Sequence, residues 1–207
     1  MSEPFHFSAV EIASLQDRAT HLWHDDPLNV VSADQPFYAT VVAQHRANFD
    51  LWHVEDRARA PRATDADIAE VKRTIDRFNQ IRNDLAERCD AMLLGYATAV
   101  PPPKGGPTLK AQLNSESPGL MIDRLSVLAL KIFHTEEELD RPNAPAGHTD
   151  RNRERLALLT EQRNDLAACL DQLWSDVLAG RRRFKIYRQL KMYNDPTLNP
   201  AIYGSKP

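Results

Sequence analysis

The sequence predicts an all-α protein, a helical bundle built from two repeated helical hairpins, on three observations. Apolar residues recur at helical spacing along most of the 207 residues, and no stretch alternates apolar and polar residues as a half-buried strand would. Prolines and glycines gather at a few breaks, which divide the chain into separate helical segments. The pentapeptide RNDLA occurs at 82–86 and again at 163–167, which indicates a duplicated unit.

One helix and one hairpin account for the first half of the single predicted domain, 1–207. An N-terminal helix is expected over 8–24, with Ser8 as the N-cap and Glu11 completing a capping box. The first hairpin copy covers 36–97, and Pro61 separates its two helices. These helices contribute two of the four core helices of the bundle.

The second half repeats this organisation. A Pro/Gly loop is expected over 98–116, where PPPKGGP prevents regular structure. The second hairpin copy covers 117–180, with Pro118 in the first turn, where its missing N–H costs nothing, and Gly180 in the position of a C-cap. The remaining residues, 181–207, are basic and then rich in turn residues. Three tyrosines predict that this irregular tail docks on the body of the bundle: Tyr187, Tyr193 and Tyr203.

The offset between the two RNDLA copies is 163 − 82 = 81 residues, and further residues align at the same offset. The aligned pairs include Trp52 with Phe133, His53 with His134, Glu55 with Glu136, Pro61 with Pro142, and Asp90 with Asp171. Matches in both helices and in the intervening break predict two copies of one hairpin, packed with approximate two-fold symmetry.

Each copy places an arginine within its apolar stripe. At about 100° per residue, Arg82 and Arg163 both fall on the apolar face of their helices. A guanidinium that remains unpaired in a core is destabilising, so each must meet a carboxylate, a carbonyl oxygen or a bound anion. Two interpretations stay open with similar weight: a clamp for an anionic ligand, or a salt-bridge network that sets the register of the helices.

Polar residues gather at two heights of the predicted bundle. The lower level provides candidate catalytic residues, and these are His53, Glu55, His134 and Glu136. The upper level gathers His45, Arg82, Asp123, Ser126 and Arg163. The start of the helix at Ser117 offers amide groups and a positive dipole end as a seat for an anion, which Gly119 would let approach closely. The predicted ligand-binding set is therefore Arg82, Arg163, Ser117, Gly119 and Asp123.

Several function classes lack support in the composition and motifs. With 26 Lys+Arg and 29 Asp+Glu the formal net charge is −3, which gives no reason to expect nucleic acid or an anionic membrane as a partner. Neither a phosphate-binding loop nor an HExxH motif occurs, and the two cysteines do not form a zinc-ligand pattern, so no metal ligands are assigned and no cofactor is identified. The opening MSEPFHFSAV lacks the pattern of a signal peptide, and a cytoplasmic protein is expected.

Four segments resemble one known family. They are ANFDLWHVEDRAR (47–59), IDRFNQIRNDLAERCD (75–90), NSESPGLMIDRLSVLALKIFH (114–134) and YRQLKMYNDPTLNP (187–200). In this order they resemble the DUF4254 family, a bacterial domain of unknown function. The resemblance implies an all-helical fold, a bacterial cytoplasmic setting and a gene neighbourhood of glycosyltransferase and lipopolysaccharide type. It implies no catalytic residue.

Three functions remain as hypotheses. The first is binding of a phosphorylated or otherwise anionic small molecule, such as a sugar phosphate or nucleotide sugar, in the polar interior, with a role in cell-surface glycan biosynthesis. The second is a metal-dependent phosphoanhydride hydrolase that holds Mg²⁺ by the acidic run, Glu136, Glu137 and Asp140. The third is an interaction module for a glycosyltransferase, or one that pairs with itself as a homodimer. The sequence leaves open whether the protein is an enzyme.

Overall fold

A computed structural model of the chain describes residues 5–99, 111–188 and 197–198. Five helices make up nearly all of its regular structure, which confirms the predicted all-α bundle. The elements in chain order are α1 (Ala9–Asp25), α2 (Pro36–Ala58), α3 (Asp65–Ala99), β1 (Gln112–Leu113), α4 (Pro118–Glu137), α5 (His148–Leu178) and β2 (Arg182–Arg183).

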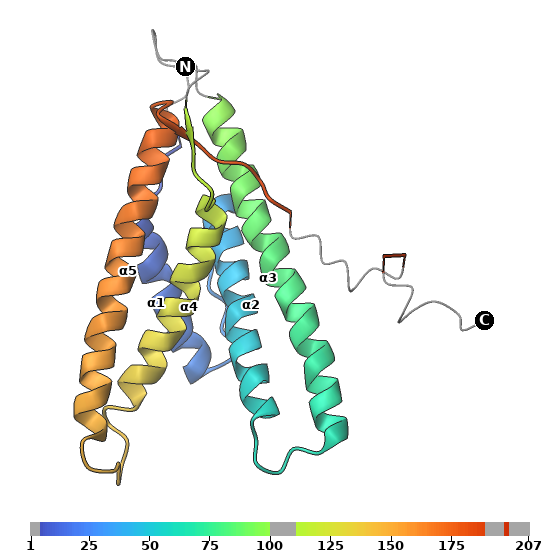
Figure 1. The fold of residues 1–207 in the computed structure, drawn as a ribbon, viewed down its shortest axis with the longest axis vertical. Helices are drawn as coiled ribbons and strands as arrows, with labels where there is room; N and C mark the ends of the chain where they lie inside the picture. Colours follow the sequence, from blue (N-terminus) through green and yellow to red (C-terminus); the bar gives the residue numbers. More distant parts are fainter. Residues whose placement is uncertain (1–4, 100–110, 189–196, 199–207) are drawn as a thin grey trace.

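Helix α4 lies at the centre of the bundle and packs against each of the other four helices. Its buried residues are mostly apolar and occupy more than one side of the helix, as a central helix requires. The pairs α2–α3 and α4–α5 form two antiparallel hairpins, and α1 crosses behind α4 and α5 (Figure 1). Helices α1, α2 and α4 run in the same direction, so their C-terminal ends lie toward one end of the molecule (Figure 1).

Local signals in the sequence explain where the helices begin and end. The hydroxyls of Ser8 and Ser117 accept hydrogen bonds from the first-turn amides of α1 and α4, at 3.4 Å in both cases. Helix α5 begins after Gly147, whose φ of 74° is a left-handed conformation that favours glycine, because glycine has no Cβ. It ends before Gly180, whose φ of 70° is the left-handed conformation of a helix C-terminus.

The segments around the second hairpin differ in part from the prediction. A two-residue parallel ladder joins β1 to β2, with Gln112 opposite Arg182. Such a pair is too short to leave an alternating pattern in the sequence. In the described part of the tail Phe184 is buried, whereas Tyr187, one of the tyrosines expected to dock, is 52% exposed. Tyr193 and Tyr203 lie outside the described residues, as do 100–110 of the Pro/Gly loop.

The core consists of two clusters of unequal size. The larger one joins all five helices and includes Phe37, Leu125 and Trp174. The smaller one lies between the C-terminal halves of α1, α2 and α4 and is built around Trp23, Phe49 and Leu130. Helices with the length and apolar character needed to cross a membrane are absent from the part of the chain that the structure describes.

Candidate functional site

Asp123 on α4 organises the polar groups at the upper level of the bundle. Its Oδ2 accepts a hydrogen bond from the Arg82 guanidinium on α3 at 2.7 Å. Its Oδ1 accepts from the amide groups of Gln44 and Asn48 on α2, at 2.5 and 2.9 Å. The Arg82 and Asp123 side chains are only 25% and 14% exposed, so the ion pair is largely shielded from water. The pair therefore joins the two hairpins through a charge-assisted contact.

His45 on α2 continues this network into the centre of the bundle. Its Nδ1 lies 2.7 Å from the hydroxyl of Ser126 on α4, and its Nε2 lies 2.9 Å from the hydroxyl of Thr20 on α1. Burial lowers the pKa of His45 to about 3, so the ring is neutral at ordinary pH. His45 and Ser126 are 81 residues apart, the offset of the predicted repeat, and they meet across the line between the hairpins.

The two arginines of the predicted clamp lie in separate ion pairs. Arg163 on α5 donates to Asp17 on α1 at 2.7 Å, whereas Arg82 pairs with Asp123. The residue that corresponds to Asp123 in the first hairpin is 123 − 81 = 42, and this position is Val42. Arg163 therefore has no equivalent carboxylate on α2 and pairs with α1 instead. Each guanidinium already holds an internal carboxylate, as a register-setting network would require.

The helix start at Ser117 is occupied by a carboxylate of the chain itself. Asp90 on α3 accepts hydrogen bonds from the Ser117 hydroxyl at 2.5 Å and from the Gly119 amide at 2.6 Å. Burial raises the pKa of Asp90 to about 6, although both hydrogen bonds oppose this shift. The backbone of α3, and not a ligand, lies close to Gly119. A Cβ at this position would be only 2.2 Å from the Ala86 carbonyl oxygen.

The acidic residues of the lower level do not converge. Glu136, one of the predicted catalytic residues, is exposed, because it lies in the last turn of α4 beyond Ile132, where the apolar stripe leaves the core. Glu55 pairs with Arg59 one turn later, at 3.0 Å. Glu137 is also half exposed and bonds to His134. The one group of the described residues that could hold a metal ion contains histidines and none of these carboxylates.

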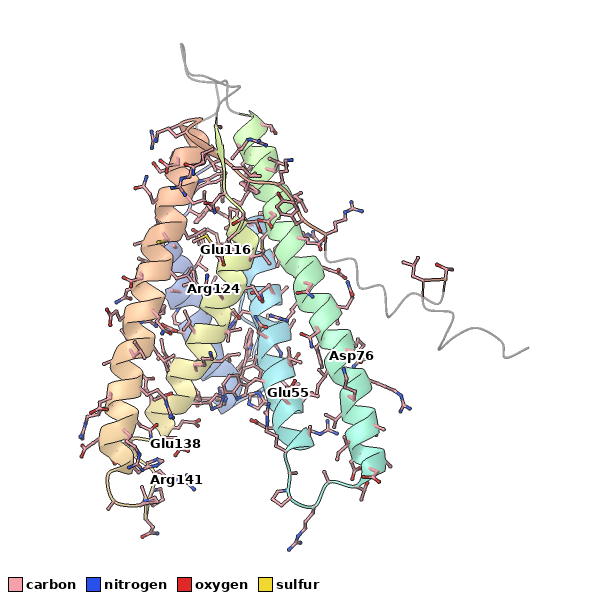
Figure 2. All side chains as sticks on the ribbon, in the orientation of Figure 1. Glu55, Asp76, Glu116, Arg124, Glu138 and Arg141 are labelled. Atoms are coloured by element: carbon pink, nitrogen blue, oxygen red, sulfur yellow. The ribbon has the colours of Figure 1, made fainter. Side chains whose placement is uncertain are left out.

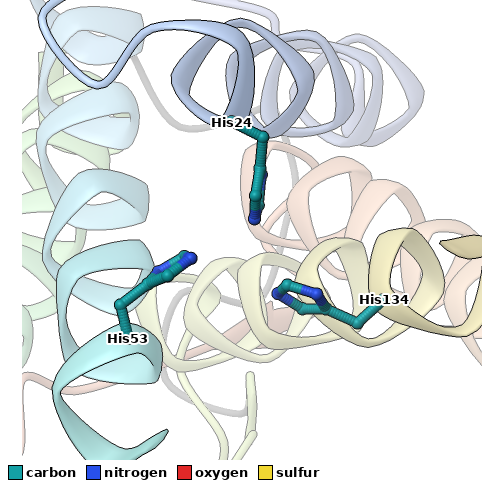
Figure 3. A group of neighbouring side chains, drawn as sticks. All are labelled: His24, His53 and His134. Atoms are coloured by element: carbon teal, nitrogen blue, oxygen red, sulfur yellow. The ribbon is translucent and has the colours of Figure 1, made fainter. Parts of the chain in front are cut away.

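Three histidines come together at the C-terminal ends of α1, α2 and α4. They are His24, His53 and His134, and their rings point toward a common centre (Figure 3). One ring nitrogen from each lies within 4.8 Å of the others. His53 and His134 are again 81 residues apart, with ring centroids separated by 6.0 Å. The sequence prediction therefore contained two of the three members and missed His24, which lies outside the repeat.

Hydrogen bonds determine which nitrogen of each ring carries the proton. Nδ1 of His24 and of His53 lies 2.8 Å from the carbonyl oxygen one turn earlier, and Nδ1 of His134 lies 2.7 Å from the Glu137 carboxylate. Carbonyl and carboxylate oxygens only accept, so each Nδ1 donates and, in the neutral ring, each Nε2 presents its lone pair. Nε2 of His24 and of His134 are shielded from solvent and have no hydrogen-bond partner among the described residues. An unsatisfied buried atom of this kind costs about 1–3 kcal/mol.

Aromatic side chains and helix ends surround this histidine cluster. The His24 ring stacks on Phe133 with centroids 4.0 Å apart, and the His134 ring stacks on Trp52 at 5.0 Å. His24 and His134 lie in the last turns of α1 and α4, where the helix dipole is negative and favours a cation. Burial lowers the pKa of His24 and the neighbouring imidazoles add to this effect, whereas the hydrogen bond to the Thr20 carbonyl oxygen opposes it.

Open clefts flank α4 on its outer side. One, of about 630 Å³, lies between α4 and α5 and is lined by His134, Lys131, Asn152, Arg155 and Gln162, among others. A second, of about 740 Å³, extends along the same helices toward Arg82 and Arg124, and shares Lys131 and Gln162 with the first. Glu116 and Arg124, which pair at 2.8 Å, mark its upper end (Figure 2).

The fold and these groups define a class: an all-α bundle of two hairpins with a polar interior, a histidine cluster and open polar clefts. Residues 38–186 match the family described as "Protein of unknown function (DUF4254)", and the chain belongs to this family. Neither the curated proteins nor the solved structures contain a match to this chain.

Proposed function

We propose that this protein binds a small anionic metabolite, through a phosphate or carboxylate group, in the cleft between α4 and α5. The observation that carries the proposal is the pair of cations that lines the cleft from facing helices, Lys131 on α4 and Arg155 on α5. The volume of about 630 Å³ lies within the range of small-molecule sites. This places the anion lower in the bundle than the Arg82–Arg163 pair that the sequence predicts.

The charges of this cleft support an anionic ligand. Among the described residues, neither Lys131 nor Arg155 forms an ion pair, and the Arg155 guanidinium donates only to the Asn152 amide oxygen, at 3.0 Å. The acidic residues of the same cleft are already engaged. Glu138 accepts from Arg141 and His148 at the α4–α5 turn (Figure 2 labels Glu138 and Arg141), and Asp56 pairs with Arg59. An anionic oxygen between Lys131 and Arg155 would therefore meet cations whose charge is not yet neutralised.

The shape of the clefts supports an elongated polar ligand. Because the two clefts share Lys131 and Gln162, they form one groove along α4 and α5. Its upper part presents amide, carboxylate and guanidinium groups that suit hydroxyl-rich ligands. A sugar phosphate or nucleotide sugar has this combination, in agreement with the glycan-related setting that the family resemblance implies. In this proposal the upper groove, with Arg82 and Asp123, holds the uncharged part of the ligand.

The proposal is tested by measuring ligand binding to matched variants. Orthophosphate, pyrophosphate, a hexose 1-phosphate and a nucleotide sugar are titrated by calorimetry into the wild type, Lys131→Ala and Arg155→Ala. Removing one charge-assisted contact of about 1.5–3 kcal/mol is expected to weaken binding by roughly ten-fold or more. Arg153→Ala is the control, because Arg153 is exposed on the same helix, pairs with Asp150 and does not line the cleft.

The pattern of affinities decides the matter. Binding that weakens in both cleft variants and remains unchanged in Arg153→Ala supports the proposal. If none of the four compounds binds the wild type, or if Arg155→Ala binds as tightly as the wild type, the cleft is not an anion site.

A further inference from the structure

We infer that His24, His53 and His134 form a binding site for one divalent transition-metal ion of the Zn²⁺ type. The site was not assigned from the sequence, and the inference does not depend on the proposed function of the cleft. It is carried by three features of the histidine cluster: the distances between the ligand atoms, the hydrogen bonds that orient the rings, and the shielded lone pairs.

The distances are close to those of a metal centre. Zn–N bonds of about 2.0–2.1 Å in tetrahedral geometry place pairs of nitrogen ligands roughly 3.3 Å apart. The nitrogens of the cluster are within 4.8 Å of one another, so rotation of the side chains by a small angle brings them to bonding distance. Because the three side chains come from three different helices that pack in the core, the protein holds them together before an ion arrives (Figure 3).

The hydrogen bonds are those that metal-binding histidines require. A ligating imidazole donates its other N–H to a carbonyl or carboxylate, which fixes the tautomer and the orientation of the ring. All three members satisfy this condition through Nδ1, and His134 does so with the Glu137 carboxylate. The three Nε2 atoms are thereby left as electron-pair donors toward the centre of the cluster.

A purely structural role does not account for these lone pairs. A histidine that only fills space in a core keeps hydrogen-bond partners for both nitrogens, as His45 does with Ser126 and Thr20. In the histidine cluster, Nε2 of His24 and of His134 are shielded from water and lack a partner among the described residues. A metal ion satisfies all three lone pairs at once, and the helix ends at His24 and His134 favour its positive charge.

The ligand set also indicates which ions bind. Imidazole nitrogen suits Zn²⁺, Cu²⁺, Ni²⁺ and Co²⁺, whereas Mg²⁺ and Ca²⁺ require oxygen ligands. Among the described residues, no fourth histidine, cysteine, aspartate or glutamate joins the group. Three protein ligands leave at least one coordination position for water or a small anion, as in catalytic zinc sites.

The test uses the full chain, purified without a histidine tag and stripped of metal by a chelator. Zn²⁺ is titrated by calorimetry, and Co²⁺ is titrated by visible absorption, because cobalt in a site of low coordination number absorbs strongly. We expect one ion per chain and no binding of Mg²⁺. His53→Ala and His134→Ala should weaken Zn²⁺ binding by more than about 100-fold, and Glu137→Gln by roughly 10-fold, because it removes only a partner of a ligand.

His21→Ala is the matched control, because His21 lies one turn before His24 on α1, is exposed and contacts the same Phe133 ring from its edge. It should bind Zn²⁺ as tightly as the wild type. Absence of saturable Zn²⁺ binding, or binding that survives in His53→Ala, overturns the inference. Anomalous diffraction at the zinc edge gives an answer that does not depend on variants, since an ion found away from the three imidazoles also overturns it.

The coordination position that the three histidines leave open on the metal ion can be tested separately. Azide added to the Co²⁺ form should change the visible spectrum, because the anion replaces a water ligand. An unchanged spectrum at saturating azide would show that the position is closed, while the three-histidine site itself would stand. Failure of the anion cleft would appear in the phosphate titrations and not in these metal titrations, so the two proposals are separable.

Discussion

Replacement of Gly119 by alanine should destabilise the protein strongly, because α3 and α4 touch at this residue. An added Cβ would lie 2.2 Å from the Ala86 carbonyl oxygen and 2.9 Å from Cγ of Asp90. Neither neighbour can move aside easily. The first is helix backbone, and the second is a buried carboxylate held by Ser117 and by the Gly119 amide. The two helices must therefore separate by roughly 1 Å to restore an ordinary contact.

The magnitude follows from the contacts that this separation breaks. Forcing an extra carbon into a packed contact costs about 1–3 kcal/mol. Loss of the 2.6 Å hydrogen bond from the Gly119 amide to the Asp90 carboxylate costs about 1.5–3 kcal/mol more. The higher helix propensity of alanine offsets up to about 1 kcal/mol. The net loss is about 1.5–6 kcal/mol, which for a chain of this length lowers the melting temperature by about 3–24 °C.

Urea unfolding followed by circular dichroism measures this loss, and Gly95→Ala provides the control. Gly95 lies within α3, and a Cβ there would meet nothing within 4 Å. The same substitution should therefore stabilise the protein at this position, by about 0.5–1 kcal/mol. Opposite signs for the two variants are the expected result. A loss of less than about 1 kcal/mol for Gly119→Ala would refute the close contact between α3 and α4.

Three other predictions concern buried polar groups and the metal. Thr20→Val leaves His45 Nε2 without its partner and should cost about 1–3 kcal/mol in urea unfolding. Burial raises the pKa of Asp90 from 3.8 to about 6, so its contribution to stability is present below about pH 4 and is lost as the pH rises through 6. The wild type should therefore lose up to about 3 kcal/mol relative to Asp90→Asn between about pH 4 and pH 7, and an equal pH dependence of the two proteins would contradict this. Zn²⁺ at about 100 times its dissociation constant for the wild type should add about 2.7 kcal/mol to the wild type and less than about 0.4 kcal/mol to His134→Ala, as thermal unfolding would report.

Much of the fold could be predicted because its signals are local. Helix starts at Ser8 and Ser117 and the helix end at Gly180 depend on residues within one turn of the boundary. The proximity of His53 and His134 could also be anticipated, because the 81-residue offset places them at matching heights of the two hairpins. The duplication itself stays a prediction, supported by the contacts at two levels between residues 81 apart.

The contacts of α1 could not be predicted, because this helix is not part of the two segments that align at the 81-residue offset. No pattern in its sequence indicates which helix it packs against. Its Asp17 is the partner of Arg163, and its His24 is the third member of the histidine cluster. Burial on one face of a helix indicates that a partner exists, but it does not indicate which of four other helices provides it. The occupation of the α4 start by Asp90 was missed for the same reason.

The contacts between α2 and α4 show why α1 matters for the site. Helices α2 and α4 bring His45 to Ser126 and His53 to His134, so at each level this pair of helices supplies two groups. Helix α1 adds one group at each level. Thr20 completes the hydrogen bonds of His45, and four residues later His24 completes the cluster with His53 and His134.

These two levels are also connected, because the Thr20 carbonyl accepts from Nδ1 of His24 while its hydroxyl bonds to His45. A series of residues joined by hydrogen bonds thus leads from Arg82 and Asp123 through Asn48, Ser126, His45 and Thr20 to His24 of the histidine cluster. In a bundle without α1, the imidazoles of His53 and His134 would form a pair that lacks both the third ligand and this support. We therefore expect a chain that begins after α1 to lose Zn²⁺ binding even where its two hairpins still fold, which circular dichroism and calorimetry on the same sample would establish.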